Sequence, residues 1–241
     1  MTARMLKMEI RDELLGILRE PTALFFSVVM PVLFYTLFVA MFGAEGPTDV
    51  RMIAPFGTFA VLAVVMMSPG IGLADARERG WLRVKRVSGT PLWVTLTAKV
   101  VASIPYAVGV LVAMTASAVI VGGMTLEIAP LARIFAVLIL GVLPFSLFSL
   151  AVGARAGTNA SAAILNGVLM PAAILSGLWF PHEIMPDWVV RIGEVLPTYH
   201  LAQLAMVQVD PGPWVGHLAV IGITAIAGAV AAGFAYRSAR P

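Results

Sequence analysis

The chain has 241 residues, of which 60% are hydrophobic and only 12% are charged, and its formal net charge is +3. Soluble domains average about 45–50% apolar and about 25% charged residues, so this composition excludes a water-soluble globule and predicts an integral membrane protein in a lipid bilayer. The absence of cysteine excludes disulfides, thiolate catalysis and cysteine-ligated metals, and the small net charge gives no reason to expect a nucleic-acid partner.

The first segment of the chain is charged but carries an apolar stripe at helical spacing. The stripe consists of Leu6, Ile10, Leu14, Ile17 and Leu18. We expect residues 1–21 to form an amphipathic helix on the cytoplasmic surface, because the charges occupy the other positions and Glu20-Pro21 breaks or redirects the chain before the first span. An ordinary helical extension of that span is the alternative.

Six later segments are apolar and long enough to cross a bilayer as helices, which takes about 20 residues each. They are Thr22–Gly43, Met52–Ala74, Val100–Leu126, Ile134–Ala154, Ala160–Phe180 and Trp214–Tyr236. The alternation of apolar and polar residues typical of a membrane β-barrel is missing. The sequence therefore predicts an all-α, polytopic membrane protein with six transmembrane helices, organised as one domain over residues 1–241.

Basic residues are distributed unevenly over the predicted loops. Of the 16 lysines and arginines, only Arg51, Arg133 and Arg191 fall on one side, which leaves 13 for the other. Cytoplasmic flanks carry the excess of lysine and arginine in membrane proteins. We therefore expect a multi-pass protein of the plasma membrane with both termini in the cytoplasm.

The cytoplasmic loop over residues 75–99, between spans two and three, mixes basic and apolar side chains. We expect Gly80 to interrupt it, Ser88-Gly89 to end a short helix, and Thr90-Pro91 to start the next one. Trp81 and Leu82 among the charges favour a protein-docking surface, while a solvated loop that only sets the topology is the alternative. The candidate docking residues are Glu78, Arg79, Gly80, Trp81, Leu82, Arg83, Lys85 and Arg86.

The outer connection over residues 181–213 is divided by prolines, which predicts short helices separated by breaks. Its candidate gate and connector residues are Pro181, His182, Glu183, Pro186, Trp188 and Pro197. His182-Glu183 lacks the second histidine that a zincin helix places four residues after the first, and His200 and His217 are scattered along the sequence. We therefore expect no metal site.

The predicted spans contain no Asp, Glu, Lys or Arg, although ion-coupled carriers usually need ionisable groups there. The phosphate-binding string G-x-x-x-x-G-K-[ST] is also missing from the chain. A separate ATPase that binds a cytoplasmic part of this chain would supply the driving force for transport. In span five, Asn166, Met170 and Gly177 fall on one face, which suggests a pathway or a dimer seam; simple helix packing is the alternative.

Two motifs resemble those of the membrane subunits, or permeases, of type-2 ABC transporters. "RERGWLRVKRVSGTPLWVTLTAK", Arg77–Lys99, is similar to the family's E-x-G-x-L … T-P … K element. "LSGLWFPHEIMPDWVVRIGEVLPTYHLAQL", Leu175–Leu204, is similar to its signature, in which S-G-x-x-F-P, M-P-x-W and L-P-x-x-x are typical. The number and order of the predicted spans and the amphipathic start agree with the family, so the resemblance covers nearly the whole chain.

The resemblance implies a permease that pairs with an identical or different second permease, each bound by a cytoplasmic ATPase subunit that holds ATP and Mg²⁺. This chain would then catalyse no chemistry and bind no cofactor itself. Glu78–Arg86 would be the coupling helix, Met5–Arg19 the interface helix, and span five with residues 181–213 would line the dimer seam and outer gate.

The predicted function is that of a permease subunit in an ATP-driven exporter. We expect its substrate to be a hydrophobic small molecule, a drug or a lipid-like compound, because nothing charged lines the predicted spans. A self-contained secondary carrier or channel is the alternative, followed at a distance by an intramembrane enzyme.

Overall fold

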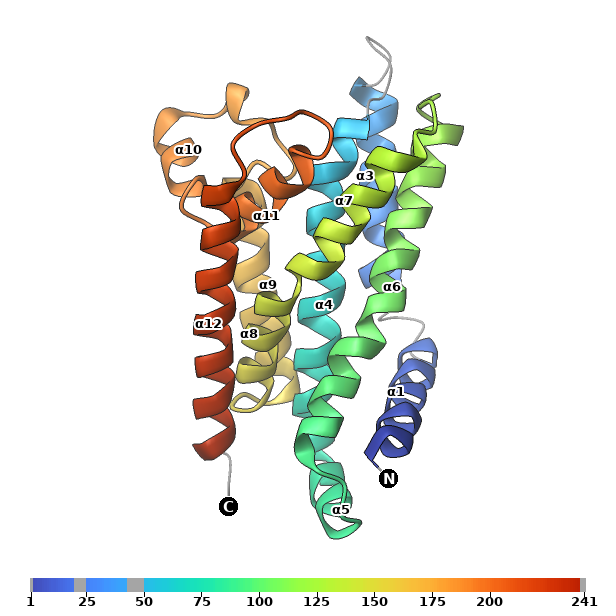
Figure 1. Ribbon diagram of the computed structural model, residues 1–241, viewed down its shortest axis with the longest axis vertical. Coiled ribbons are helices and arrows are strands. Elements are labelled where there is room, and N and C mark those ends of the chain that lie inside the picture. Colours follow the sequence, from blue (N-terminus) through green and yellow to red (C-terminus); the bar gives the residue numbers. More distant parts are fainter. Residues whose placement is uncertain (1, 20–24, 43–49, 239–241) are drawn as a thin grey trace.

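The computed structural model describes residues 2–19, 25–42 and 50–238, and over these ranges the chain forms helices, turns and loops without a strand. Long helices run side by side, α1 lies beside one end of the bundle, and α10 and α11 cover the other end (Figure 1). In chain order the elements are α1 (Thr2–Leu18), η1 (Phe25–Val29), α3 (Met30–Phe42), η3 (Val50–Met52), α4 (Ile53–Glu78), α5 (Trp81–Val87), α6 (Leu92–Ile120), α7 (Ile128–Gly141), α8 (Leu143–Gly153), α9 (Thr158–Leu175), η4 (His182–Ile184), α10 (Asp187–Gly193), α11 (Pro197–Met206) and α12 (Val215–Ser238).

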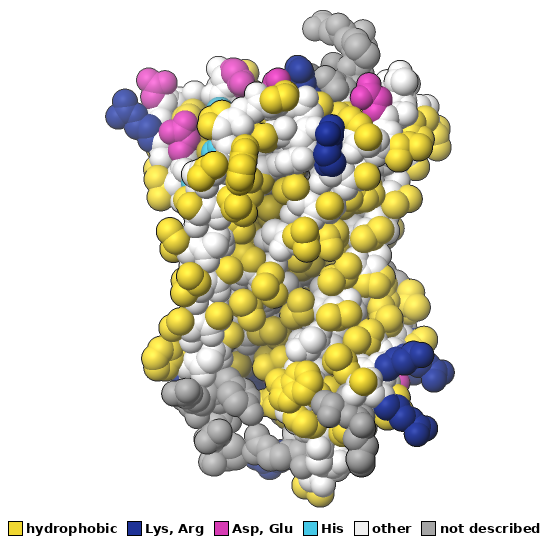
Figure 2. Space-filling view, viewed as in Figure 1, with side chains coloured by type: hydrophobic (Ala, Val, Ile, Leu, Met, Phe, Trp, Pro, Cys, Tyr) yellow, Lys and Arg dark blue, Asp and Glu magenta, His cyan; other side chains and the backbone are white. Residues whose placement is uncertain are grey.

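Five stretches of the described residues are long and apolar enough to cross a membrane. They are Val50–Glu78, Leu92–Ile120, Ile128–Gly153, Thr158–Leu175 and Val215–Ala235. A further apolar helix, Met30–Met41, is shorter, and both ends of the predicted span Thr22–Gly43 lie outside the described residues, as does the predicted break at Glu20-Pro21. The all-helical, polytopic fold is confirmed, whereas the sixth span stays a prediction. Figure 2 shows hydrophobic side chains over the middle of the molecule and charged ones at its two ends.

Three helices differ from their predicted boundaries. α6 begins at Leu92, directly after an extended Pro91 and within one residue of the predicted start at Thr90-Pro91, and it ends at Ile120, before the predicted end of the third span at Leu126. The predicted fourth span is two helices, α7 and α8, which meet at Val142. α9 ends at Leu175 rather than Phe180, because Gly177 adopts a φ of +71°, outside the helical region.

α4 is the central helix of the bundle. It packs against α3, α6, α7, α8, α9 and α11, and it is buried along most of its length. A helix that is apolar on every side must be covered on every side by other helices or by lipid. The α8 backbone approaches it closely, because a Cβ atom added at Gly153 would overlap the carbonyl oxygen of Gly70. Glycine at this crossing allows the two backbones to touch.

α1, α5 and the last turns of α12 lie at one end of the bundle, and the connector helices lie at the other (Figure 1). The predicted cytoplasmic segments therefore share one end of the molecule. This arrangement agrees with the topology that the basic residues predict.

Candidate functional site

The loop between α4 and α6 folds into a compact protrusion, here called the coupling hairpin and defined as residues 79–91. Its short helix α5 is flanked by Gly80 and Gly89, each with a φ of +75°. Glycine adopts this left-handed conformation without the steric cost that other residues have. The predicted interruption at Gly80 and the predicted end at Ser88-Gly89 are therefore confirmed.

One side of α5 is apolar and open. Trp81, Val84 and Val87 follow one another at steps of three residues and are 55%, 56% and 90% exposed. Residues at this spacing share a helix face. Val84 and Val87 were not among the predicted docking residues, although their spacing from Trp81 was a readable signal. Leu82, which was predicted with Trp81, is half-buried.

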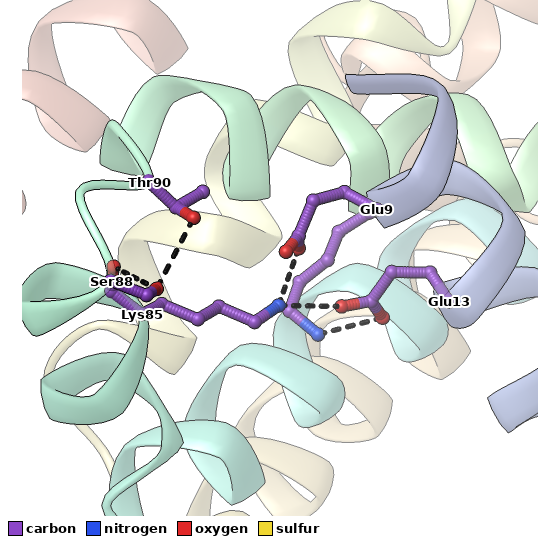
Figure 3. Close-up of polar contacts among 6 residues, drawn as sticks. Glu9, Glu13, Lys85, Ser88 and Thr90 are labelled. Carbon is purple, nitrogen blue, oxygen red and sulfur yellow. Dashed lines mark hydrogen bonds and ion pairs between the residues drawn. The ribbon is translucent and has the colours of Figure 1, made fainter. Parts of the chain in front are cut away.

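The charged residues of the hairpin mostly have partners within the chain. The Lys85 ammonium lies 2.5 Å from Glu9 Oε2 and 3.9 Å from Glu13 Oε1, and both carboxylates belong to α1 (Figure 3). Glu13 Oε2 also lies 2.9 Å from Lys99 Nζ on α6, and Lys99 is only 5% exposed. Lys85 is thus engaged with α1 within the chain, and its place on the docking surface stays a prediction.

We name these four residues, Glu9, Glu13, Lys85 and Lys99, the cytoplasmic ion cluster. It joins α1 to α5 and α6, which lie more than 70 residues later in the sequence. Glu9, Glu13 and Lys99 were not predicted as site residues. Two acidic residues at a spacing of four on α1 were the available signal, because such residues share a face.

Glu78 also has a structural partner. Its carboxylate accepts hydrogen bonds from Thr158 N at 3.1 Å and Thr158 Oγ1 at 2.5 Å, so it caps the first turn of α9. The neighbouring Arg77 guanidinium donates to the carbonyl oxygens of Ala154 and Ala156. Together these bonds tie the end of α4 to the turn between α8 and α9.

Among the predicted docking residues whose side chains are described, the exposed ones are Glu78, Arg79, Trp81 and Arg83. The Arg79 side chain is paired with Asp75 at 2.7 Å, one helical turn earlier. The side chain of Arg86 lies outside the described part of the chain.

The predicted interface helix packs against protein. Leu6, Ile10 and Leu14 are half-buried in α1, which runs along α6. The Tyr106 hydroxyl of α6 donates a 2.7 Å hydrogen bond to the Leu14 carbonyl oxygen. α1 is therefore held to α6 by its apolar stripe, by this bond and by the cytoplasmic ion cluster.

A largely apolar cavity of about 470 Å³ lies between α1, α3, α4 and α9. It is lined by Ile17, Met30, Pro31, Phe34, Phe59, Ala63, Met67, Ser68, Ile71, Asn166, Leu169, Met170 and Trp179. Asn166 and Met170, predicted together on one face of span five, both reach it, and the Asn166 amide donates to Ala162 O at 2.9 Å. Gly177 does not line it; this residue lies beyond α9, against the His182 ring.

Aromatic rings form one wall of this cavity. The Trp179 ring lies 5.0 Å from the Phe34 ring and 4.8 Å, edge-on, from the Phe59 ring, measured between centroids. Such tilted and edge-on pairs are the favourable arrangements for aromatic side chains. The lining of the cavity thus combines rigid aromatic rings with the flexible side chains of methionines.

The connector at the opposite end is divided at its prolines, as predicted. Pro181 precedes η4, Pro186 precedes α10, and Pro197 is the first residue of α11. Trp188 and Glu183 are exposed. His182 instead points back at the end of α9, where its Nε2 lies 3.1 Å from the Leu175 carbonyl oxygen.

The structure brings two of the histidines together. His200 and His217 are scattered in sequence but meet in space, with their Nδ1 atoms 2.7 Å apart. Within the described residues there is no group of three His, Asp or Glu side chains that could hold a metal ion.

The helical bundle, the apolar cavity and the exposed hairpin define a polytopic membrane protein of the transporter class. The family model of the ABC-2 type transporter matches residues 5–209. The chain belongs to this family of ABC transporter permeases, which makes it a transporter subunit and not an enzyme. It is also 26% identical over 207 residues, 83% of each chain, to YvfS of Bacillus subtilis (strain 168), whose name describes a transport permease.

Proposed function

We propose that the chain is the permease subunit of an ATP-driven exporter and that its coupling hairpin docks on a separate cytoplasmic ATPase, which holds ATP and Mg²⁺. The observation that carries this proposal is the exposed apolar face of Trp81, Val84 and Val87. This face belongs to α5, which lies at the same end of the molecule as α1, beyond the hydrophobic band that lipid would cover (Figures 1 and 2). An aromatic residue within an exposed apolar patch is a typical anchor of protein interfaces.

The cytoplasmic ion cluster supports a route from the hairpin to the cavity. Lys85 holds α5 to Glu9 and Glu13 of α1, and Ile17, one turn further along α1, lines the cavity. A displacement of α5 by the ATPase would therefore move α1 and reshape the cavity wall. In this proposal Glu9 and Glu13 are positioning residues for the hairpin.

The lining of the cavity supports a hydrophobic substrate. Its volume falls within the roughly 300–1,000 Å³ that small-molecule sites occupy, and Ser68 and Asn166 are the polar side chains in its wall. Apolar residues on the outer face of α9, including Ile164, Val168 and Ile174, are exposed and would meet a second permease at the dimer seam. With the basic end in the cytoplasm of a plasma-membrane protein, the connector would close the outer side.

Copurification with the ATPase tests the docking role. The variant Trp81→Ala/Val84→Asp should insert normally but lose the ATPase, because it removes the apolar anchor and places a charge in the contact. Ile184→Asp is the matched control, since Ile184 is also an exposed apolar residue but lies at the connector end. Retention of the ATPase by the double variant would refute the docking role.

Transport of a lipophilic fluorescent dye in proteoliposomes tests the driving force. Dye movement should require both the ATPase and ATP. Accumulation by the chain alone, driven by an ion gradient, would instead identify a secondary carrier and refute the exporter proposal.

A further inference from the structure

Two imidazoles face each other at the connector end of the molecule. His200 belongs to α11 and His217 to the first turn of α12, and their Nδ1 atoms are 2.7 Å apart with ring centroids at 5.0 Å. A hydrogen bond at this distance requires that one Nδ1 carries a proton and the other accepts it. This contact is therefore sensitive to the protonation of both rings.

The surroundings of the pair contain few other titratable groups. The Tyr199 ring meets both imidazoles edge-on, and His182 from η4 stacks on the other side of Tyr199 at 5.4 Å. The backbone of Glu194, in the turn between α10 and α11, forms a hydrogen bond with His200, and the charge of Glu194 affects the pKa of Tyr199. These three are the titratable or charged groups that face the pair from the described elements packed around it.

Burial, followed by the proximity of His217, lowers the pKa of His200 below its usual value of 6.5, while the backbone of Glu194 opposes this shift. Burial and the charge of Glu194 raise the pKa of Tyr199, so its hydroxyl stays neutral throughout the physiological range. Imidazole is the side chain whose charge ordinarily changes between about pH 5 and pH 8, so the contact between His200 and His217 can respond to pH in this range.

α11 links the end of α9, a helix that lines the cavity, to α12. The Ser176 and Thr198 hydroxyls form a buried 2.5 Å hydrogen bond that joins the end of α9 to the start of α11. Leu201 of α11 fits against Gly141, where a Cβ atom would collide with the leucine side chain. On its other side α11 packs against α12, where the histidine contact lies. α11 thus connects a helix that lines the cavity with the last helix of the bundle.

We propose that His200 and His217 form a shared proton-binding site that latches α11 to α12 and releases it when both rings are protonated. When both rings are neutral, or when only one of them has bound an additional proton, an N–H of one ring still donates to the bare nitrogen of the other. With two added protons, both Nδ1 atoms carry hydrogen and two positive charges oppose each other, so the contact is lost. The protons come from the solvent and return to it when the pH rises.

The direction of the effect follows from the linkage between protonation and structure. A histidine whose pKa is lowered in the folded contact stabilises that contact above its ordinary value of about 6.5 and loses this contribution as the pH falls towards the lowered value. The pair titrates in two coupled steps that belong to both rings together. Acid therefore opens the connector end, and neutral pH closes it.

Distances between spin labels on the full-length chain in lipid nanodiscs test the proposal. The chain has no cysteine, so Val195→Cys, just before α11, and Leu218→Cys, on α12, give unique labels at two exposed positions. Between pH 8 and pH 5.5 the distance distribution should become longer and broader, and it should return on neutralisation. A distribution that is unchanged over this range would overturn the proposal without the need for any histidine variant.

Histidine variants of the labelled chain assign the response. His217→Gln removes one of the two titrating rings, so its distance distribution should no longer depend on pH; His200→Gln serves the same purpose if the first variant fails to fold. His182→Gln is the matched control, because it removes the remaining histidine of the chain, which stacks on Tyr199 and does not touch the pair. A pH response that survives in His217→Gln, or that disappears in His182→Gln, would overturn the assignment.

Discussion

Replacement of Glu13 by glutamine removes the counter-ion of Lys99, which is the most buried charge of the cytoplasmic ion cluster. Glu13 lies 2.9 Å from Lys99 Nζ, and the Lys99 side chain is almost inaccessible to solvent. Glutamine keeps the size and a hydrogen-bonding oxygen but removes the negative charge. The Lys99 ammonium then stays buried without its counter-ion.

The expected loss of stability is about 3 kcal/mol. Removal of one partner from a buried pair costs about 3–5 kcal/mol, and the partial exposure of Glu13 places this case at the lower end. For a chain of this size the melting temperature should fall by roughly 6–12 °C. The double variant Glu13→Gln/Lys99→Gln should recover at least about 1.5 kcal/mol relative to the sum of the single variants, because it leaves no unpaired charge.

Thermal unfolding in detergent, followed by tryptophan fluorescence, measures these values. Arg79→Gln is the matched control, because it breaks an exposed ion pair of similar length at the same end of the bundle and should cost under about 1 kcal/mol. Equal effects of Glu13→Gln and Arg79→Gln, or strict additivity in the double variant, would show that Lys99 does not depend on Glu13.

Three further predictions concern other contacts of the bundle. Gly153→Ala should prevent stable folding, since its methyl group would overlap the α4 backbone, whereas Gly167→Ala, with open space around it, should leave the melting temperature unchanged or slightly higher. Glu78→Ala should accelerate hydrogen exchange in the first turn of α9, because the amide of Thr158 loses its acceptor; unchanged exchange there would contradict the capping role. Met170→Trp should lower ATP-dependent dye transport by filling the cavity while ATPase association persists, and full transport would argue against this cavity as the pathway.

Several features of the molecule could be predicted from sequence because they depend on local properties. Hydropathy over about 20 residues identified the helical membrane fold, and glycine and proline marked the ends of α5 and the breaks of the connector. Their effects act within one or two turns of the chain. The family motifs added the expected roles of these segments.

The sequence predicted the boundaries of α6 and α9 less well than it predicted the membrane fold. The third span was predicted to begin after Lys99, at Val100, whereas the structure buries Lys99 in α6, where a carboxylate from α1 is its counter-ion. α9 stops before its apolar run ends because Gly177 turns the chain towards His182. A partner distant in sequence thus accounts for the burial of Lys99, whereas the end of α9 depends on a local glycine turn.

By itself the sequence determined that the chain is a helical membrane protein, and it identified the end of the bundle that carries the basic charge. Only the tertiary structure decided which side chains meet: Lys85 with Glu9, Asn166 and Met170 with the cavity, and His200 with His217. Helices in a bilayer are apolar on nearly all sides, so their composition does not indicate which face meets which neighbour. That choice depends on the rotation and crossing of whole helices, and these are set by close packing across the entire bundle.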